Sequence, residues 1–200
     1  FNCKFCTARE IYSPFRPVEM SRLTAIFDKA AASGRKLGLV STSLNNHPRL
    51  TQLLEEIGAR KLRIAPPSLR LGMLSEELLA YMKASGVNEV TLAPEVGSDT
   101  LRAALGKRVS GEAILEDVAS LVRSGIRDIK LYLMVGLPGQ RQDDLEAAVD
   151  LVKRIRQTFI QVSRGNRRIG RVSVSINAMV PKPHTQYERE AMLDPGEAKK

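Results

Sequence analysis

The sequence predicts an α/β fold, and within that class an incomplete, open-sided parallel barrel of the TIM-like kind with about six βα units. Strand patterns alternate with helix patterns along the whole chain, which is typical of parallel strands joined by right-handed crossovers. The predicted strands carry one apolar face and one polar or mixed face. A closed barrel of eight units needs roughly 250 residues. This chain has 200, and we assign residues 1–200 to one domain.

Strands are expected where aliphatic and β-branched residues gather between turn-forming residues. Pro66 and Pro67 end the second strand, because proline cannot donate to a β-ladder. A sixth strand is expected before residue 1, so the first strand of the barrel would be missing from this fragment. The five strands predicted within the chain are Lys36–Thr42, Lys61–Ala65, Glu89–Ala93, Asp128–Val135 and Val172–Val180.

Helices are expected where apolar residues recur every three or four positions between capping residues. In Val18–Gly34 the apolar positions share one face and the glycine ends the helix. Ser75 is expected to cap a helix that carries Glu76 and Glu77 in its first turn and ends at Gly86. The other predicted helices are Arg49–Ile57 (stopped by Gly58), Ser98–Leu105, Ser110–Ser124 and Asp143–Phe159.

The two-faced strands distinguish a barrel from an open doubly wound sheet, whose strands are buried on both faces and apolar throughout. We expect helices to cover the apolar face and the polar face to line a cavity. In Asp128–Val135 the apolar set is Ile129, Leu131, Leu133 and Val135, and the opposite set is Lys130, Tyr132 and Met134. Val172, Val174 and Ile176 likewise oppose Ser173, Ser175 and Asn177.

In parallel barrels the chemistry lies at the carboxyl ends of the strands. In this chain those ends are rich in Ser, Thr, Asn, Glu, Gly and Pro. They comprise Thr42–Asn45, Ala65–Arg70, Glu95–Ser98, Gly136–Gly139 and Asn177–Thr185. A cysteine loop at the start of the chain is expected at the same edge, after the missing first strand.

The cysteine loop reads FNCKFCTARE and holds Cys3 and Cys6, the two cysteines of the chain. Two thiolates on one tight loop can share a metal or a cluster. Three interpretations stay open on this motif alone. A redox pair needs a preceding strand and a helix that starts at the motif. A zinc site needs two more ligands, and an iron–sulfur cluster needs at least one more thiolate.

The charge balance favours an anionic partner. The chain has 31 Lys and Arg against 22 Asp and Glu, a net charge of +9. RNA or a phosphate-bearing substrate fits this excess, and so does a basic proteome or an acidic domain outside the chain. No apolar run is long enough to span a membrane. Two cysteines at this spacing argue against a secreted disulfide scaffold, and we expect a cytoplasmic location.

The cysteine loop and three later stretches resemble the radical S-adenosylmethionine (radical SAM) superfamily. Its signature is C-x-x-x-C-x-x-C on the loop after the first strand. Cys3 and Cys6 match the second and third cysteines, and the first would lie two residues before Phe1. The later stretches are LAPEVGSDTLR (Leu92–Arg102), KLYLMVGLPGQ (Lys130–Gln140) and SINAMVPKPHT (Ser175–Thr185). The resemblance is greatest to the subgroup with tRNA methylthiotransferases, the elongator catalytic subunit and cobalamin-binding members.

This resemblance implies an enzyme in which a 4Fe-4S cluster reductively cleaves S-adenosylmethionine to a 5′-deoxyadenosyl radical. A protein such as flavodoxin or ferredoxin would donate the electron to the cluster. The substrate is not identified; methylthio or methyl transfer to RNA or to a small molecule belongs to this subgroup, as does cobalamin in a flanking domain. The fragment alone is expected to be inactive because it holds two of the three cysteines.

The resemblance also implies roles for individual residues. Cys3 and Cys6 would ligate iron, Glu95 would accept hydrogen bonds from the ribose, and the backbone of Gly136, Leu137 and Pro138 would pair with the adenine edge. The second strand ends in Val40-Ser41-Thr42-Ser43 where many members have Gly-Gly-Glu, so short hydroxyls would face the cofactor amine. The further expected cofactor contacts are Phe5, Ser98, Arg102 and Asn177.

Structural roles compete with several of these assignments. Glu95 and Ser98 stand where residues that cap a helix are found, and Gly136–Gly139 also fits a plain strand-to-helix turn. Lys130 and Tyr132, on the polar strand face, would pair with Glu95. Two other functions also stay open. One is a barrel that binds a ligand without catalysis, and the other is a different α/β barrel enzyme whose C-x-x-C binds zinc or is redox-active.

Overall fold

The computed structural model describes residues 3–34, 36–41, 44–65, 69–164, 170–194 and 196. Every strand pairing in it is parallel, and the strands follow one another in chain order across the molecule. The predicted α/β class with parallel strands is therefore confirmed. No closed barrel forms among the described residues, in agreement with an open-sided architecture.

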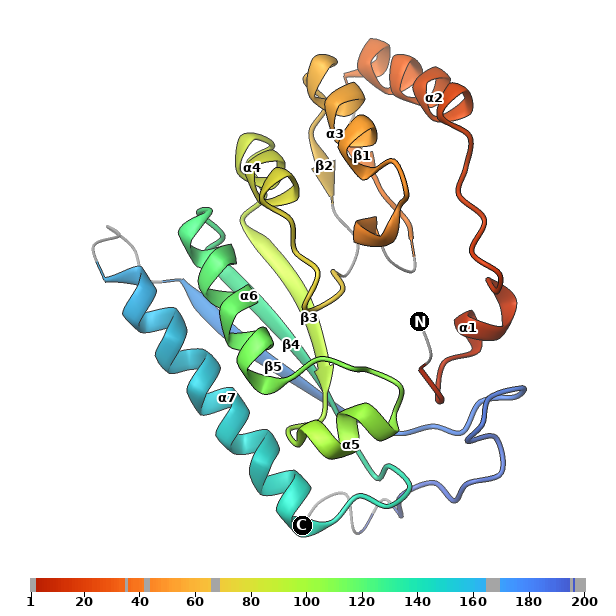
Figure 1. The fold of residues 1–200 in the computed structure, drawn as a ribbon, viewed down its shortest axis with the longest axis vertical. Coiled ribbons are helices and arrows are strands. Elements are labelled where there is room, and N and C mark those ends of the chain that lie inside the picture. The colour runs from red at the N-terminus through yellow and green to blue at the C-terminus, as the bar shows by residue number, and fades with distance from the viewer. Residues whose placement is uncertain are drawn as a thin grey trace.

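The N-terminal half contains two very short strands between helices (Figure 1). Gly34 ends the second helix in a left-handed conformation with φ of 64°, as its place in the sequence predicts. The elements of this half are α1 (Thr7–Ile11), α2 (Met20–Ser33), β1 (Leu37–Gly38), the 3-10 helix η1 (Leu44–Asn46), α3 (Leu50–Ala59) and β2 (Ile64–Ala65).

The C-terminal half holds the longer strands and the longest of the described helices. Ser75 accepts a hydrogen bond from the Leu78 N–H and caps its helix, which confirms that prediction. The elements are α4 (Glu76–Ala84), β3 (Glu89–Glu95), α5 (Asp99–Ala104), α6 (Gly111–Arg123), β4 (Asp128–Val135), α7 (Gln142–Ser163) and β5 (Arg171–Ala178).

Two expectations about the elements are wrong, and one helix was not expected. The described strands form two hydrogen-bonded sheets, β1-β2 and β3-β4-β5, where one continuous sheet was expected. A single bridge between Leu69 and Leu92 links the loop after β2 to β3. Gly58 lies inside α3 and does not stop it, since tertiary packing of the adjacent Ile57, fully buried, outweighs a weak propensity. The short helix α1, directly after Cys6, has no periodic pattern that predicts it.

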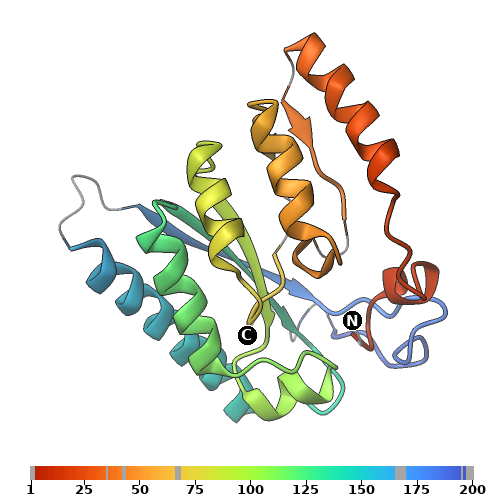
Figure 2. The same ribbon diagram turned by 45° about the horizontal axis from the view of Figure 1, so that its top comes forward.

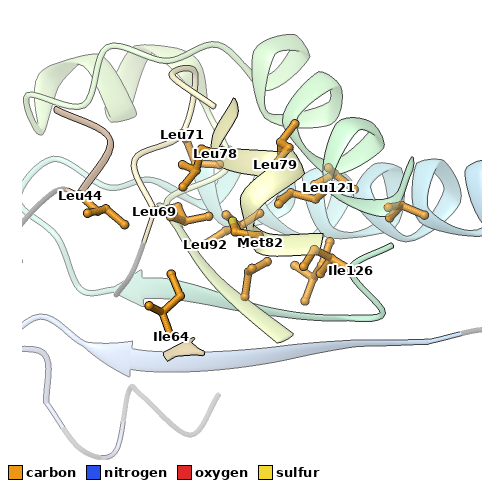
Figure 3. Close-up of a cluster of buried hydrophobic side chains, with 14 of the residues drawn as sticks. Leu44, Ile64, Leu69, Leu71, Leu78, Leu79, Met82, Leu92, Leu121 and Ile126 are labelled. Atoms are coloured by element: carbon orange, nitrogen blue, oxygen red, sulfur yellow. The ribbon is translucent and has the colours of Figure 1, made fainter. Parts of the chain in front are cut away.

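The main hydrophobic core lies between the strands and the helices on one side of them (Figures 1 and 2). Leu92 of β3 packs there with side chains of α4 and α6, among them Met82 and Leu121 (Figure 3). Ile129, Leu131 and Leu133 of β4 are 0–5% exposed, so the predicted apolar face is the one the helices cover.

The edge strand β5 departs from this pattern. Val174 and Ile176 are in register with the buried Leu131 and Leu133, yet they are 40% and 61% exposed. The expectation that helices cover this part of the apolar face is therefore wrong for β5. Among the described residues no helix follows β5, whereas side chains of α7 belong to the core cluster that buries Ile129 and Leu131 of β4.

Candidate active site

A second, small hydrophobic cluster gathers the carboxyl ends of the three long strands. Its buried members are Val96 after β3, Leu101 and Leu105 of the α5 region, Leu137 after β4 and Met179 after β5. Phe5 of the cysteine loop, Met134 and Tyr187 pack against it. The four stretches that resemble the radical SAM pattern are thus brought together at one end of the sheet by their own apolar residues.

The cysteine loop is fixed to this cluster through its backbone. The Lys4 N–H donates to the Leu105 carbonyl at 3.0 Å, and the Gln186 N–H donates to the Lys4 carbonyl at 3.1 Å. The Cys6 N–H donates to the Cys3 carbonyl at 3.2 Å in a tight turn, and both thiols are free. Burial raises the pKa of the Cys3 thiol, and the Lys107 ammonium opposes that shift. Lys107 therefore lies close enough to act on Cys3.

Glu95 ends β3 in an unusual backbone conformation. Its φ is +68°, which is strained for a residue with a side chain. The register of β3 against β4 shifts between Leu92 and Glu95, and Pro94, which has no N–H for the ladder, lies in the irregular segment. The bulge turns the Glu95 side chain, which is 11% exposed, toward the cysteine loop: its charge is among the influences that raise the pKa of Cys3.

Lys107 holds the Glu95 carboxylate. Its ammonium lies 2.6 Å from Glu95 Oε1 and donates to the Ala93 carbonyl at 2.8 Å. The Lys107 side chain is 18% exposed, so this ion pair is largely shielded from water. Sequence reasoning missed Lys107, because it lies twelve positions after Glu95 in a connecting segment with no motif of its own. It instead expected Lys130 or Tyr132 to pair with Glu95, and that expectation is wrong.

Arg102 is fully buried and shapes the loop that follows Glu95. Its guanidinium donates to the carbonyls of Val96 and Gly97, both at 2.8 Å, and to Asp99 Oδ1 at 2.6 Å. A further bond to the Val109 carbonyl leaves Nε as its one buried nitrogen without a partner among the described residues. The structure thus gives Arg102 a positioning role, where the resemblance implied a direct cofactor contact.

Ser98 is also engaged by the protein. Its hydroxyl accepts from the Leu101 N–H at 3.3 Å as the cap of α5 and donates to Asp144 Oδ1 at the start of α7. That hydrogen bond is the main reason why the pKa of Asp144 is lowered. Ser98 therefore ties the loop after β3 to α7, in line with the structural alternative.

The turn after β4 has the conformation that its glycines predict. Gly136 has φ of +73° and Gly139 has φ of +75°, which side chains rarely adopt. Gln140 closes the turn, because its side chain accepts from the Leu137 N–H and donates to the Met134 carbonyl, both at 3.3 Å. A Cβ at Gly136 would lie 2.7 Å from the Leu193 side chain. Leu137 is buried and Pro138 half-buried, so backbone rather than side chains is presented here.

The remaining predicted residues are less closely gathered. Asn177 is exposed on β5, in register with Met134. Ser41 is exposed after β1 and lines an apolar pocket of about 470 Å³ with Leu23, Leu39 and Leu53, none of which belongs to the small cluster. Thr42 and Ser43 lie outside the described residues.

The metal ligands in this region account for part of an iron–sulfur cluster site. Cys3 and Cys6 can supply two thiolate ligands, and the described residues form no group of three or more His, Cys, Asp or Glu that could hold a metal ion. A strained carboxylate and its lysine lie within electrostatic reach of the Cys3 thiol, and Leu137 of the turn after β4 belongs to the small cluster on which Phe5 packs. Such an arrangement can hold a polar ligand whose hydroxyl and ring-edge groups need charged and backbone partners. Among the described helices none is long and apolar enough to cross a membrane.

A family model and curated proteins are similar in sequence to this chain. A family model described as the radical SAM superfamily matches residues 1–152. The uncharacterized protein MJ0966 of Methanocaldococcus jannaschii is 30% identical over 190 residues, which cover 94% of this chain and 40% of that protein. The ribosomal protein uS12 methylthiotransferase RimO of Clostridioides difficile is 25% identical over 174 residues, 78% of this chain and 38% of its own length. The chain thus spans about two fifths of these curated relatives.

The solved structure of coproporphyrinogen III oxidase (HemN) from Escherichia coli has a similar fold. It superposes with a TM-score of 0.56 at 15% sequence identity, over 98% of this chain and 46% of that one. At this identity the likeness is one of fold alone, and it agrees with a partial, open barrel.

Proposed function

Because the chain belongs to the radical SAM superfamily, we propose that it is the core of an enzyme that binds S-adenosylmethionine at the carboxyl ends of β3 and β4. A bound 4Fe-4S cluster would supply the one electron that splits S-adenosylmethionine into methionine and a 5′-deoxyadenosyl radical, and this radical would abstract hydrogen from a substrate. Cys3 and Cys6 would be two of the thiolate ligands. Flavodoxin or ferredoxin would be the electron donor.

The observation that carries this proposal is the approach of the cysteine loop to the end of β3. Cys3 is buried within the electrostatic reach of both Glu95 and Lys107, although more than ninety positions separate them in sequence. Phe5 packs on the same small cluster as Val96 and Leu137. A cluster ligand, a ribose acceptor and an adenine-facing turn would therefore lie around one space.

Each residue has a defined task in this proposal. Glu95 accepts hydrogen bonds from the ribose hydroxyls, and Lys107 orients that carboxylate before the ligand arrives. Arg102 and Ser98 hold the loop that carries Glu95. Backbone groups of the Gly136–Pro138 turn, other than the Leu137 N–H that Gln140 accepts, pair with the adenine edge, and the burial of Leu137 helps to exclude water.

The test uses the full-length protein that contains this chain, purified without oxygen and reconstituted with iron and sulfide. Dithionite and S-adenosylmethionine are added, and 5′-deoxyadenosine is measured. We expect the wild type to form it and Cys3→Ala or Cys6→Ala to lose both iron and product, because each removes a thiolate. Lys4→Ala is the matched control, since the loop uses only the Lys4 backbone.

Two results would reject the proposal. One is a double variant, Cys3→Ala with Cys6→Ala, that retains an intact cluster and cleaves the cofactor. The other is a wild type that binds zinc in place of iron and forms no 5′-deoxyadenosine, which would favour the zinc interpretation of the C-x-x-C motif.

A further inference from the structure

The polar face of the three-stranded sheet brings hydroxyl and ammonium groups into adjacent positions. The strand register aligns Thr91 of β3, Lys130 of β4 and Ser173 of β5 in one row. Tyr132 and Ser175 form the next row toward the carboxyl ends. Neighbouring strands are about 4.8 Å apart. All five side chains are half-buried on the face opposite the helix-covered core, so they share one surface on the inside of the open barrel.

Lys130 is directed along this face toward the candidate active site. Its ammonium lies 5.0 Å from the centre of the Tyr132 ring, and Tyr132 is two residues closer to the carboxyl end of β4. A cation over an aromatic face is stabilised, yet that contact does not neutralise the charge. The side chain therefore presents a fixed positive charge inside the barrel.

The carboxylates of β3 and the start of β4 either make other contacts or lie exposed. Glu95, at the end of β3, pairs with Lys107 at 2.6 Å. Asp128, two residues before Lys130, accepts the Arg171 N–H at 3.0 Å, and Glu89 is exposed at the start of β3. Lys130 makes no ion pair with any residue that the structure describes. A half-buried ammonium without a counter-ion loses hydration without full compensation.

We propose that Lys130 is the centre of an oxyanion-binding site on this face and that the substrate carries a carboxylate or a phosphate held there. Thr91, Ser173, Ser175 and the Tyr132 phenol would donate hydrogen bonds around the Lys130 charge. The role as substrate anchor rests on the function proposed above, because it needs a radical formed at the strand ends. The binding of an anion does not.

The first measurement is chemical modification of lysines in the full-length protein, without iron and without S-adenosylmethionine. Acetic anhydride labels the lysines, mass spectrometry quantifies each one, and inorganic phosphate or acetate is added at constant ionic strength. We expect saturating phosphate, acetate or both to slow the labelling of Lys130 at least threefold. Lys153, which is exposed on α7, is the control and should not change. The anion that protects better identifies the phosphate or the carboxylate class.

The second measurement compares variants by the thermal midpoint, since a ligand that binds the folded state raises it. The anion that protects Lys130 should raise the midpoint of the wild type, of Lys130→Arg and of Lys153→Met, but not that of Lys130→Met. Equal protection of Lys130 and Lys153, protection by neither anion, or an unchanged shift in Lys130→Met would overturn the site.

A third readout separates this proposal from the function it builds on. The readout is the formation of 5′-deoxyadenosine by the reconstituted wild type. A wild type that shows anion protection at Lys130 but never cleaves S-adenosylmethionine would refute the proposed function and leave the anion site standing.

Discussion

The two halves of the molecule differ in how firmly their strands are joined. In the C-terminal half, β4 and β5 pair over eight consecutive residues, from Asp128–Arg171 to Val135–Ala178. In the N-terminal half, β1 and β2 pair over two. The apolar faces of β3 and β4 are also buried under helices, whereas Val40, just after β1, is fully exposed.

This difference coincides with the distribution of the candidate site. Phe5, Glu95 and Leu137 converge on the C-terminal half, while Ser41 stays on the other side with the apolar pocket. A long strand fixes the position of its last residue through many backbone bonds, and a two-residue strand cannot. We infer that the residues of the candidate cofactor site whose positions are most tightly fixed are those at the ends of β3 and β4.

The largest expected effect contrasts two glycines. A Cβ at Gly97 would lie 2.0 Å from the Ala148 nitrogen, within the backbone of α7, which cannot give way. Gly97→Ala should therefore destabilise the protein by about 3 kcal/mol or more. Gly38→Ala in β1 meets no atom within 4 Å and should change stability by less than about 1 kcal/mol. Urea denaturation of the two variants measures both, and equal losses would mean that the halves do not differ as described.

A smaller effect concerns Asp117, which ties the halves together. Its carboxylate on α6 accepts the Gly72 N–H, in the loop after β2, at 2.5 Å. Burial raises the pKa of Asp117 to about 6. The folded state therefore holds this proton more tightly than the unfolded chain, whose Asp pKa is about 3.9, and stability falls as the pH rises from there to about 6.

Asp117→Asn should remove that fall, which we expect to be about 1–3 kcal/mol, and should keep the bond to Gly72 through its amide oxygen. Stability measured between pH 4 and pH 7 checks this. The control Glu116→Gln alters the neighbouring charge and should leave most of the slope in place. Identical slopes for Asp117→Asn and the wild type would contradict the assignment.

The smallest effect concerns helix caps. Ser75 caps α4 through the Leu78 N–H, so Ser75→Ala should cost about 1 kcal/mol. Glu19 has the same position before α2 but makes no capping bond, and its ion pair with Arg49 is exposed at 3.8 Å. Glu19→Ala should therefore cost less than about 0.5 kcal/mol. Thermal unfolding of both variants distinguishes them, and a larger loss at Glu19 would show that α2 depends on its first turn.

Local sequence signals predicted the parts of the fold that local physics controls. Strict alternation over eight residues placed β4 at its observed bounds, and Gly136 and Gly139 marked a turn that needs positive φ. The split between β2 and β3 was not predicted, because strand pairing depends on long-range contacts. The prolines that follow Ala65 in the sequence predicted where β2 ends, but not which strand it pairs with.

The sequence predicted which residues gather at the candidate site but not the hydrogen bonds and ion pairs between them. The residue pattern placed Cys3, Glu95 and Gly136 at one edge, and they are found near that edge. Nothing in the sequence indicated that Lys107 pairs with Glu95. Nor did it indicate that the Arg102 guanidinium donates its hydrogen bonds to carbonyls of the neighbouring loop. Those bonds depend on how one loop folds over another, which neither periodicity nor spacing encodes.

The measurement that tests the account most directly is the affinity of the reconstituted full-length protein for S-adenosylmethionine in two variants of β3. Glu95→Gln changes the buried carboxylate at the carboxyl end of the strand, and Glu89→Gln changes the exposed one at its start. A charged hydrogen-bond partner contributes about 1.5–3 kcal/mol, so Glu95→Gln should raise Kd about 10- to 100-fold and Glu89→Gln should leave it unchanged. Circular dichroism checks that both variants are folded. An unchanged Kd in a folded Glu95→Gln protein would contradict the placement of the cofactor at the end of β3.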